Sequence, residues 1–298
     1  RNMTDTSFRG LFPILAMPFD ENGNVDEEDL RKEVEFCIST GADGLGLAMA
    51  SEIPKLSEDE RNLATKTVVE QSEGRAKVVI NTSATSTELT IHMSQNAAEL
   101  GADSIMIIPP TGVSEYEIRS HYENISQSIN LPIFIQDIDF APVAPELAAK
   151  LARDNENVSY AKVETLPTPP RVSEAVNKGE GNLIVFGGAG GSFLVEELLR
   201  GAVGTMPWVS IPEAYRKTLD LFFAGNPDEA RSNINRFEPI LRTLAQPQVC
   251  FSFTKEILKM RGVFKSNSVR KPYDIPDQDA FTELQRLVNE LELTAYAF

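Results

Sequence analysis

The stretches that decide the fold are STGADGLGLA (residues 39–48) and ELGADSIMII (residues 99–108), which lie about 60 residues apart. In each, a helix-like segment stops at a glycine, a common position for ending a helix, and an apolar run of strand length follows at once. LRGAVGTMP (199–207) repeats the pattern. If each repeat holds two strand–helix units, four repeats supply eight strands and end near residue 225.

The rest of the chain fits this arrangement. Eight apolar runs have strand length: 11–17, 43–48, 77–81, 103–108, 132–136, 158–162, 182–186 and 203–206. Helix patterns follow them at 26–40, 57–73, 86–100, 115–130, 144–155, 168–179, 191–201 and 209–224. Such alternation predicts parallel strands covered by helices.

We therefore expect an α/β fold, a (β/α)8 TIM barrel over residues 1–225, with a C-terminal helical extension over 226–298 in the same structural unit. The extension should hold helices at 226–244, 248–262 and 277–294. A doubly wound open sheet is the alternative, but eight evenly spaced units favour the barrel.

The charge balance limits the class of partner. The 298 residues carry 28 basic and 44 acidic side chains, a net charge of −16, which argues against nucleic acid or an anionic membrane surface. A small anionic substrate remains compatible, because a site can be locally positive. Cys37 and Cys250 lack metal-ligand spacing, so we expect two core thiols and no metal. No apolar run could span a bilayer, and RNMTDTSF (1–8) has no signal-peptide core, so we expect a cytoplasmic location.

Candidate chemistry lies where strands end, because active sites of such barrels lie at the C-terminal ends of the strands. In SYAKVETLP (159–167), Lys162 ends the sixth predicted strand and Glu164 follows two residues later. Alternation along a strand would place both side chains on one side. A neutral lysine can form a Schiff base with a carbonyl, and a neighbouring carboxylate can move protons beside it. A structural ion pair is the alternative.

Two further strand-end stretches could hold an anion. FGGAGG (186–191) offers Gly187 and Gly188, whose backbone N–H groups could approach an anion at a helix start, although a tight turn would explain the glycines equally well. AMASE (48–52) offers Ala50 and Ser51, or merely begins the next helix. NTSATS (81–86) and IQDIDF (135–140) also follow strands. His92 and His121 fall inside helix patterns, and we expect them to be surface or structural residues. Trp208 we expect at the rim or in the core.

These motifs resemble, over nearly the full length, the dihydrodipicolinate synthase / N-acetylneuraminate lyase family of class I aldolases. The resemblance rests on GLFPILAMPF with GNVDEEDL (10–30), GADGL (41–45), SEIPKLSEDER (51–61), LGADSIMIIPP (100–110), LPIFIQD (131–137), AKVE (161–164), GAVGTM (201–206) and KEILKMRGV (255–263). It implies an eight-stranded barrel with C-terminal helices and a Schiff base between Lys162 and a 2-oxo acid. It also implies catalysis without a metal or organic cofactor, and a homotetramer.

The departures from the family pattern are informative. The usual Gly-Thr-Thr-Gly-Glu loop is Ala48 to Glu52 here, so we expect the substrate carboxylate to be held by Ala50, Ser51, Gly187 and Gly188. The usual tyrosine after the fourth strand is replaced by Pro110 or Thr111. The Tyr-Asn pair of the fifth strand is Gln136-Asp137, and Gln136 could contact substrate hydroxyls.

In the family the missing tyrosine relays the proton during aldol cleavage. Without it, Glu164 becomes the candidate general acid/base, and general acid–base help is worth about 10²–10⁴ in rate. The pattern is similar to the L-2-keto-3-deoxyarabonate dehydratase branch, which implies dehydration of a 2-keto-3-deoxy sugar acid to a 2-oxo acid semialdehyde. The alternatives are an aldolase or synthase that releases or uses pyruvate, a hydroxy-pyrroline-carboxylate deaminase, and a non-catalytic barrel that binds a 2-oxo acid.

Overall fold

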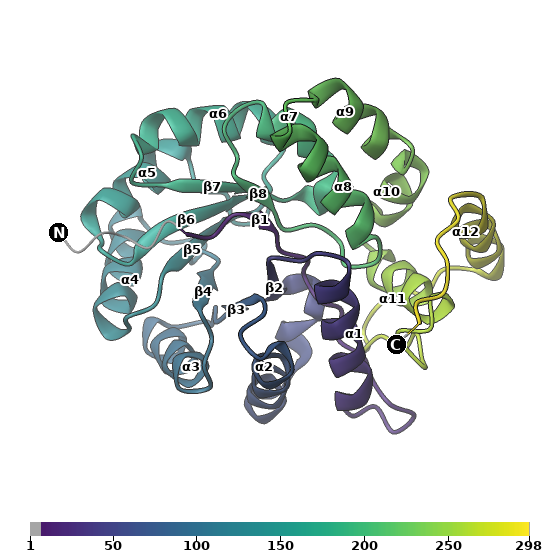
Figure 1. Ribbon diagram of the computed structural model, residues 1–298. Helices are drawn as coiled ribbons and strands as arrows, with labels where there is room; N and C mark the ends of the chain where they lie inside the picture. The colour runs from purple at the N-terminus through teal and green to yellow at the C-terminus, as the bar shows by residue number, and fades with distance from the viewer. Residues whose placement is uncertain (1–6, 298) are drawn as a thin grey trace.

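Eight parallel strands form the centre of the molecule (Figure 1), described by a computed structural model over residues 7–297. Residues 1–6, on which part of the localisation prediction rests, lie outside the described range. The strands are β1 (Gly10–Leu11), β2 (Gly44–Leu47), β3 (Lys77–Asn81), β4 (Ser104–Ile107), β5 (Ile133–Asp137), β6 (Val158–Val163), β7 (Ile184–Gly187) and β8 (Gly204–Thr205). Their order is β1-β8-β7-β6-β5-β4-β3-β2.

The sheet closes between the β1 and β2 segments, where backbone hydrogen bonds join Leu11 to Asp43, and Pro13 and Leu15 to Gly46. Ile14, just beyond β1, forms parallel bridges with both Gly46 of β2 and Trp208 beyond β8. This closure confirms the predicted barrel over the open sheet. The first strand is shorter than the predicted 11–17, because Pro13 has no N–H group to continue a ladder.

The helices that surround the barrel fall close to the predicted ranges. They are α1 (Glu27–Ser39), α2 (Glu58–Ser72), α3 (Thr87–Glu99), α4 (Glu115–Ser128), α5 (Pro145–Asp154), α6 (Thr168–Gly179), α7 (Leu194–Leu198) and α8 (Pro212–Phe223). Short 3-10 turns lie at η1 (Met49–Ser51), η2 (Ile53–Lys55) and η3 (Ala189–Gly191). Within residues 7–297 no helix is both long enough and apolar enough to cross a lipid bilayer.

The three repeated sequence segments share one type of helix C-terminus. Gly41, Gly101 and Gly201 have φ of +96°, +94° and +98°. At the first, Gly41 N–H donates to the Ile38 carbonyl and Ala42 N–H to the Cys37 carbonyl, and the same pair of bonds recurs at the other two. This is the Schellman arrangement, which requires a left-handed residue that glycine supplies without a steric penalty.

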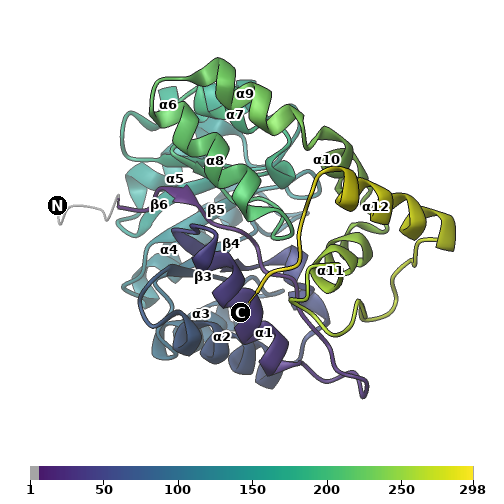
Figure 2. The ribbon, with the colours of Figure 1, turned by 45° about the vertical axis from the view of Figure 1, so that its right-hand side comes forward.

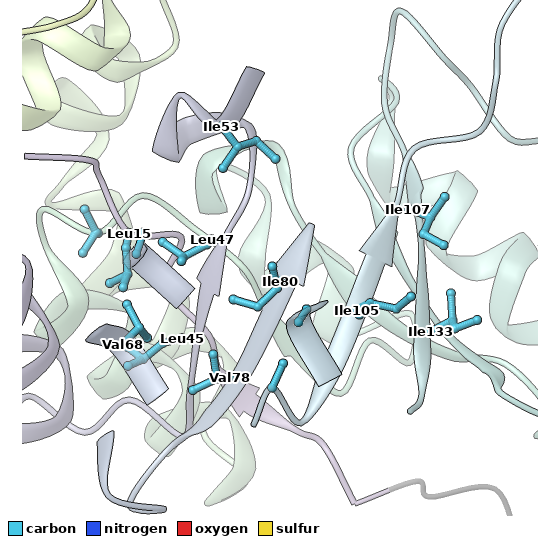
Figure 3. Close-up of a cluster of buried hydrophobic side chains, with 14 of the residues drawn as sticks. Leu15, Leu45, Leu47, Ile53, Val68, Val78, Ile80, Ile105, Ile107 and Ile133 are labelled. Carbon is cyan, nitrogen blue, oxygen red and sulfur yellow. The ribbon is translucent and has the colours of Figure 1, made fainter. Parts of the chain in front are cut away.

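Apolar side chains fill the space on both sides of the strands. Outward-facing residues of β2, β3 and β4, among them Leu45, Ile80 and Ile105, pack beneath the surrounding helices (Figure 3). Inside the barrel, aromatic rings form a plug, in which Phe134 and Tyr160 stack with centroids 4.6 Å apart. Because side chains alternate along a strand, the next inward positions, two residues further on, lie above this plug.

The C-terminal extension lies beside the barrel (Figure 2). It comprises α9 (Pro227–Asn235), α10 (Glu238–Leu244), α11 (Cys250–Met260) and α12 (Gln278–Glu290). The single helix predicted over 226–244 is wrong, since the chain breaks at Phe237, and Pro239, at the second position of α10, cannot donate a helical hydrogen bond. The chain returns to α1, where Tyr296 packs edge-on against Phe36 with ring centroids 5.3 Å apart.

Candidate active site

Lys162 and Glu164 lie at the C-terminal end of β6, as the sequence predicts. Lys162 is 4% exposed and is paired in register with Gln136 of β5 and Phe186 of β7. The strand ends at Val163, and the Glu164 N–H donates to the Asp137 carbonyl at 2.7 Å. This places the Glu164 carboxylate in contact with the Lys162 amine, where the two form an ion pair through Oε1.

The pair opens into a cavity of ≈ 710 Å³ at the same end of the barrel. Lys162, Glu164, Gln136 and Ala50 all line it, so four of the predicted site residues are brought together. Much of the remaining wall is apolar: Ile14, Met49, Ile138, Phe140, Leu166, Phe193, Met206, Pro207, Trp208, Leu241, Leu244 and Phe251. The last three come from the C-terminal extension, which therefore completes the cavity.

Ser51 does not line this cavity. Its side chain is fully buried, and its hydroxyl donates to the Leu15 carbonyl while accepting from the Ala48 N–H at 3.0 Å. Its own N–H donates to the Ala48 carbonyl at 2.9 Å. Both of its donors are therefore used to hold η1 in shape, which leaves Ala50 as the cavity-lining residue of the predicted pair.

Gly187 and Gly188 also lie outside the cavity lining, and the structure explains them by close packing. A Cβ atom at 187 would overlap the carboxylate of Glu197, and one at 188 would overlap the side chain of Glu164. Positive φ values begin after Gly188, at Ala189, Gly190 and Gly191, and the first two of these residues line the cavity. Gly188 thus provides the space in which Glu164 lies.

Gln136 is held on both sides by hydrogen bonds. Its Nε2 donates to Glu164 Oε2 at 3.2 Å, and its Oε1 accepts from Asn81 Nδ2 at 2.8 Å. Gln136 is fully buried and Asn81 is 2% exposed. The sequence does not identify Asn81 as a site residue. The only indication of its role is that a polar residue lies at the end of the third strand, where NTSATS begins.

The side chain of Asp137 stabilises the backbone to which the Glu164 N–H is hydrogen bonded. Its carboxylate accepts two hydrogen bonds from Arg171, each 2.8 Å long, and one from Thr165 Oγ1 at 2.7 Å. It also accepts from the Val143 N–H at 2.8 Å, which ties down the loop after β5. Asp137 therefore joins the ends of β5 and β6 to α6, a structural role that differs from contact with substrate.

Glu197 is a buried carboxyl group that the sequence did not reveal. Its side chain is inaccessible to solvent, Oε1 accepts from Thr168 Oγ1, and Oε2 has no hydrogen-bond partner within residues 7–297. Burial raises the pKa of Glu197 to about 8, and the negative charges of Glu196 and Glu164 add to the shift. With this pKa the carboxyl group is mostly protonated at pH 7. It packs directly against the backbone of Gly187.

The remaining candidates occupy structural positions. His92 contacts Glu58 and His121 contacts Thr87, outside the cavity, in agreement with the prediction for both. Trp208 lies in the cavity wall, as does Cys250, whose thiol pKa is raised by burial. Among the described residues, no group of three histidine, cysteine or carboxylate side chains is arranged to hold a metal ion.

Comparison with known proteins places this geometry in context. The family model described as the dihydrodipicolinate synthetase family matches residues 7–291. An L-2-keto-3-deoxyarabonate dehydratase of Azospirillum brasilense is 30% identical over 294 residues, covering 95% of this chain and 94% of the relative. A 4-hydroxy-tetrahydrodipicolinate synthase of Desulfotalea psychrophila is 26% identical over 295 residues, covering 96% and 97%.

Solved structures share the fold. The dihydrodipicolinate synthase of Aquifex aeolicus superposes with a TM-score of 0.90 at 23% identity, covering 97% of this chain and 100% of that one. The enzyme of Rhodopseudomonas palustris gives a TM-score of 0.89 at 24% identity, covering 95% and 97%.

Proposed function

Since the chain belongs to the dihydrodipicolinate synthetase family, and is therefore a lyase of the class I aldolase type, we propose that it dehydrates a 2-keto-3-deoxy sugar acid through a Schiff base. The observation that carries the proposal is the contact between Lys162 and Glu164 in the wall of the cavity. It supplies a nucleophile and a proton-transfer group side by side.

The proposed reaction begins at the substrate carbonyl. The Lys162 amine attacks C2, and loss of water from the adduct gives an iminium ion. The iminium withdraws electrons from C3, so that Glu164 can remove a C3 proton and leave an enamine. The enamine electrons then form the C3–C4 double bond as the C4 hydroxyl departs with a proton as water. Hydrolysis returns free Lys162, and tautomerisation of the released product gives the semialdehyde.

The chain's own residues favour elimination over carbon–carbon cleavage. Cleavage requires a base at the C4 hydroxyl, and the positions at which the family carries tyrosines hold Gln136 and the segment of Pro110 and Thr111. Gln136 cannot act as a base, and it already donates to Glu164. The dehydratase activity of the Azospirillum relative agrees with this choice. In this reading, Ala50 and the neighbouring η1 backbone lie against the substrate carboxylate.

Borohydride trapping tests the nucleophile. Incubation with pyruvate and sodium borohydride should add one reduced pyruvyl group, which peptide mass spectrometry should locate on Lys162. Lys162→Met should abolish the adduct. Folded wild-type protein that gives no adduct on Lys162 would rule out the Schiff-base mechanism.

Glu164→Gln tests the proton-transfer role. The amide retains the shape of the carboxylate but cannot accept a proton, so pyruvate should still be trapped on Lys162. Elimination from a 2-keto-3-deoxy sugar acid should fall about 10²–10⁴-fold, the usual contribution of a general base. Semialdehyde formation can be measured across a panel of sugar acids. Full activity in this variant would show that Glu164 is not the base.

The family also supports a second candidate, an aldolase or synthase, because several relatives are 4-hydroxy-tetrahydrodipicolinate synthases. The two activities differ in their products. An aldolase would release pyruvate from the sugar acid and a synthase would consume it, whereas a dehydratase would leave the carbon chain intact. A hydroxy-pyrroline-carboxylate deaminase would consume water and release ammonia.

A further inference from the structure

A chain of hydrogen bonds runs from the end of β4 to Glu164. The Ile108 N–H donates to Ser83 Oγ at 2.8 Å, and the Ser83 N–H donates to Asn81 Oδ1 at 3.0 Å. Asn81 Nδ2 then donates to Gln136 Oε1 at 2.8 Å, and Gln136 Nε2 donates to Glu164 Oε2 at 3.2 Å. Each member donates to the next, and the last acceptor is the carboxylate beside Lys162.

The direction of this chain is fixed at its origin. A backbone N–H can only donate, so the Ser83 N–H requires the oxygen of the Asn81 amide, and the Asn81 NH₂ must face Gln136. Gln136 must then accept with its oxygen and present its NH₂ to Glu164. Asn81 and Gln136 are almost completely buried, so solvent does not offer them other partners.

The chain therefore fixes the orientation of the Glu164 carboxylate. Oε2 is held as an acceptor by the NH₂ group of Gln136, and turning the Gln136 amide would break its bond with Asn81. The remaining oxygen, Oε1, is left facing the Lys162 amine.

We propose that Asn81 and Gln136 are positioning residues that hold the Glu164 carboxylate with Oε1 turned toward Lys162, where it can remove the C3 proton. This inference rests on the proposed function, because it concerns the general base of that reaction. A purely structural role would make the two amides a link between β3 and β5, without effect on the rate of proton removal once the Schiff base has formed.

The experiment follows the exchange of pyruvate methyl protons for deuterium in D₂O by NMR. Exchange requires both the Schiff base and a base at C3, and it needs no knowledge of the natural sugar acid. In Gln136→Met and Asn81→Leu the maximal exchange rate should fall about 10-fold or more, with little change in the pyruvate concentration that half-saturates it, because each variant removes the donor that orients Glu164 or the support of that donor.

Asn81→Asp provides a nearly isosteric second variant. Aspartate would accept from Gln136 Nε2, which would turn the glutamine oxygen toward Glu164 and reverse the chain. The exchange rate should then fall at least as far as in Asn81→Leu. Thr82→Val is the matched control, since Thr82 is buried beside Asn81 but bonds with Ser94 outside the chain of hydrogen bonds. Its exchange rate should match that of the wild type.

The outcomes separate the two proposals. Wild-type protein that traps no pyruvate on Lys162 would overturn the proposed function. Wild-type protein that traps and exchanges pyruvate, with wild-type exchange rates in folded Asn81→Asp and Gln136→Met, would overturn the inference alone. An equal loss of exchange in Thr82→Val would also overturn it, since the effect would then come from general loosening of β3. Borohydride trapping should persist in all four variants.

Discussion

At the scale of single residues, the site depends on small side chains as much as on reactive ones. Glu164 reaches Lys162 because Gly188, on the neighbouring strand end, leaves room for its methylene groups. The adjacent Gly187 does the same for the buried carboxyl group of Glu197. Two consecutive glycines therefore accommodate two acidic side chains, and neither is needed there for a positive φ.

Gly188→Ala should reduce elimination by about 100-fold, because the new Cβ would displace Glu164 and a displacement of about 1 Å can have that effect. Trapping of pyruvate should persist, since Lys162 is not touched by the change. Gly181→Ala is a suitable comparison, because no atom lies within 4 Å of the position that the new Cβ would take. Its positive φ should cost some stability, but elimination should be fully retained. Loss of trapping and elimination together in Gly188→Ala would contradict this account.

The sequence predicted the positions of Lys162 and Glu164 better than their surroundings. Lys162 and Glu164 follow from strand alternation and the position of a strand end, both of which are local properties. The environment of Ser51 could not be predicted, because its hydroxyl bonds with the carbonyl of Leu15, 36 residues away. The orientation of Gln136 depends on Asn81, two strands away. The burial of Glu197 depends on the packing of α7 against the end of β7 at Gly187. Contacts between distant segments leave no spacing pattern to find.

At the scale of elements, α11 is attached to the barrel by a buried ion pair. Lys255 contacts Glu52, and both side chains are fully buried. Lys255 also donates to the Ser268 carbonyl at 2.7 Å, and the Arg270 N–H donates to Glu52 Oε1 at 3.0 Å. Because α11 carries Phe251 into the cavity wall, this attachment also shapes the site.

Lys255→Met should lower the free energy of unfolding by about 3 kcal/mol, because it removes the buried countercharge at Glu52 Oε2 and leaves only Lys55, whose Nζ lies 3.9 Å from Oε1. The double variant Glu52→Gln with Lys255→Met should recover much of that loss, which urea unfolding of the three proteins can measure. Lys77→Met removes a pair with Asp103 that is substantially exposed, and it should cost less than about 1 kcal/mol. A double variant as unstable as Lys255→Met would show that the buried charge is not the cause.

At the scale of the whole molecule, buried carboxyl groups and surface ion pairs give stability opposite dependences on pH. The pKa of Glu60 is lowered to about 2, mainly by its hydrogen bonds with Arg270, so its contribution is complete above the ordinary pKa and lost in acid. The pKa of Glu197 is raised to about 8, mainly by burial, and that of Glu33 is also raised by burial. Their contributions are complete below the ordinary pKa and are lost as the pH rises through the folded-state values.

We therefore expect the protein to be more stable at pH 5.5 than at pH 8. Throughout this interval Glu197 is ionised in the unfolded chain, while the folded protein retains the proton until the pH approaches the folded-state pKa of about 8, which weakens folding by up to about 1.4 kcal/mol per pH unit. Glu197→Gln, which preserves the shape of the protonated acid, should remove that part of the slope in urea unfolding at the two pH values. Added salt should reduce only the contribution from the net charge of −16, since it screens exposed charges much more than buried ones. Equal slopes for the variant and the wild type in high salt would show that Glu197 is ionised in the folded protein at neutral pH.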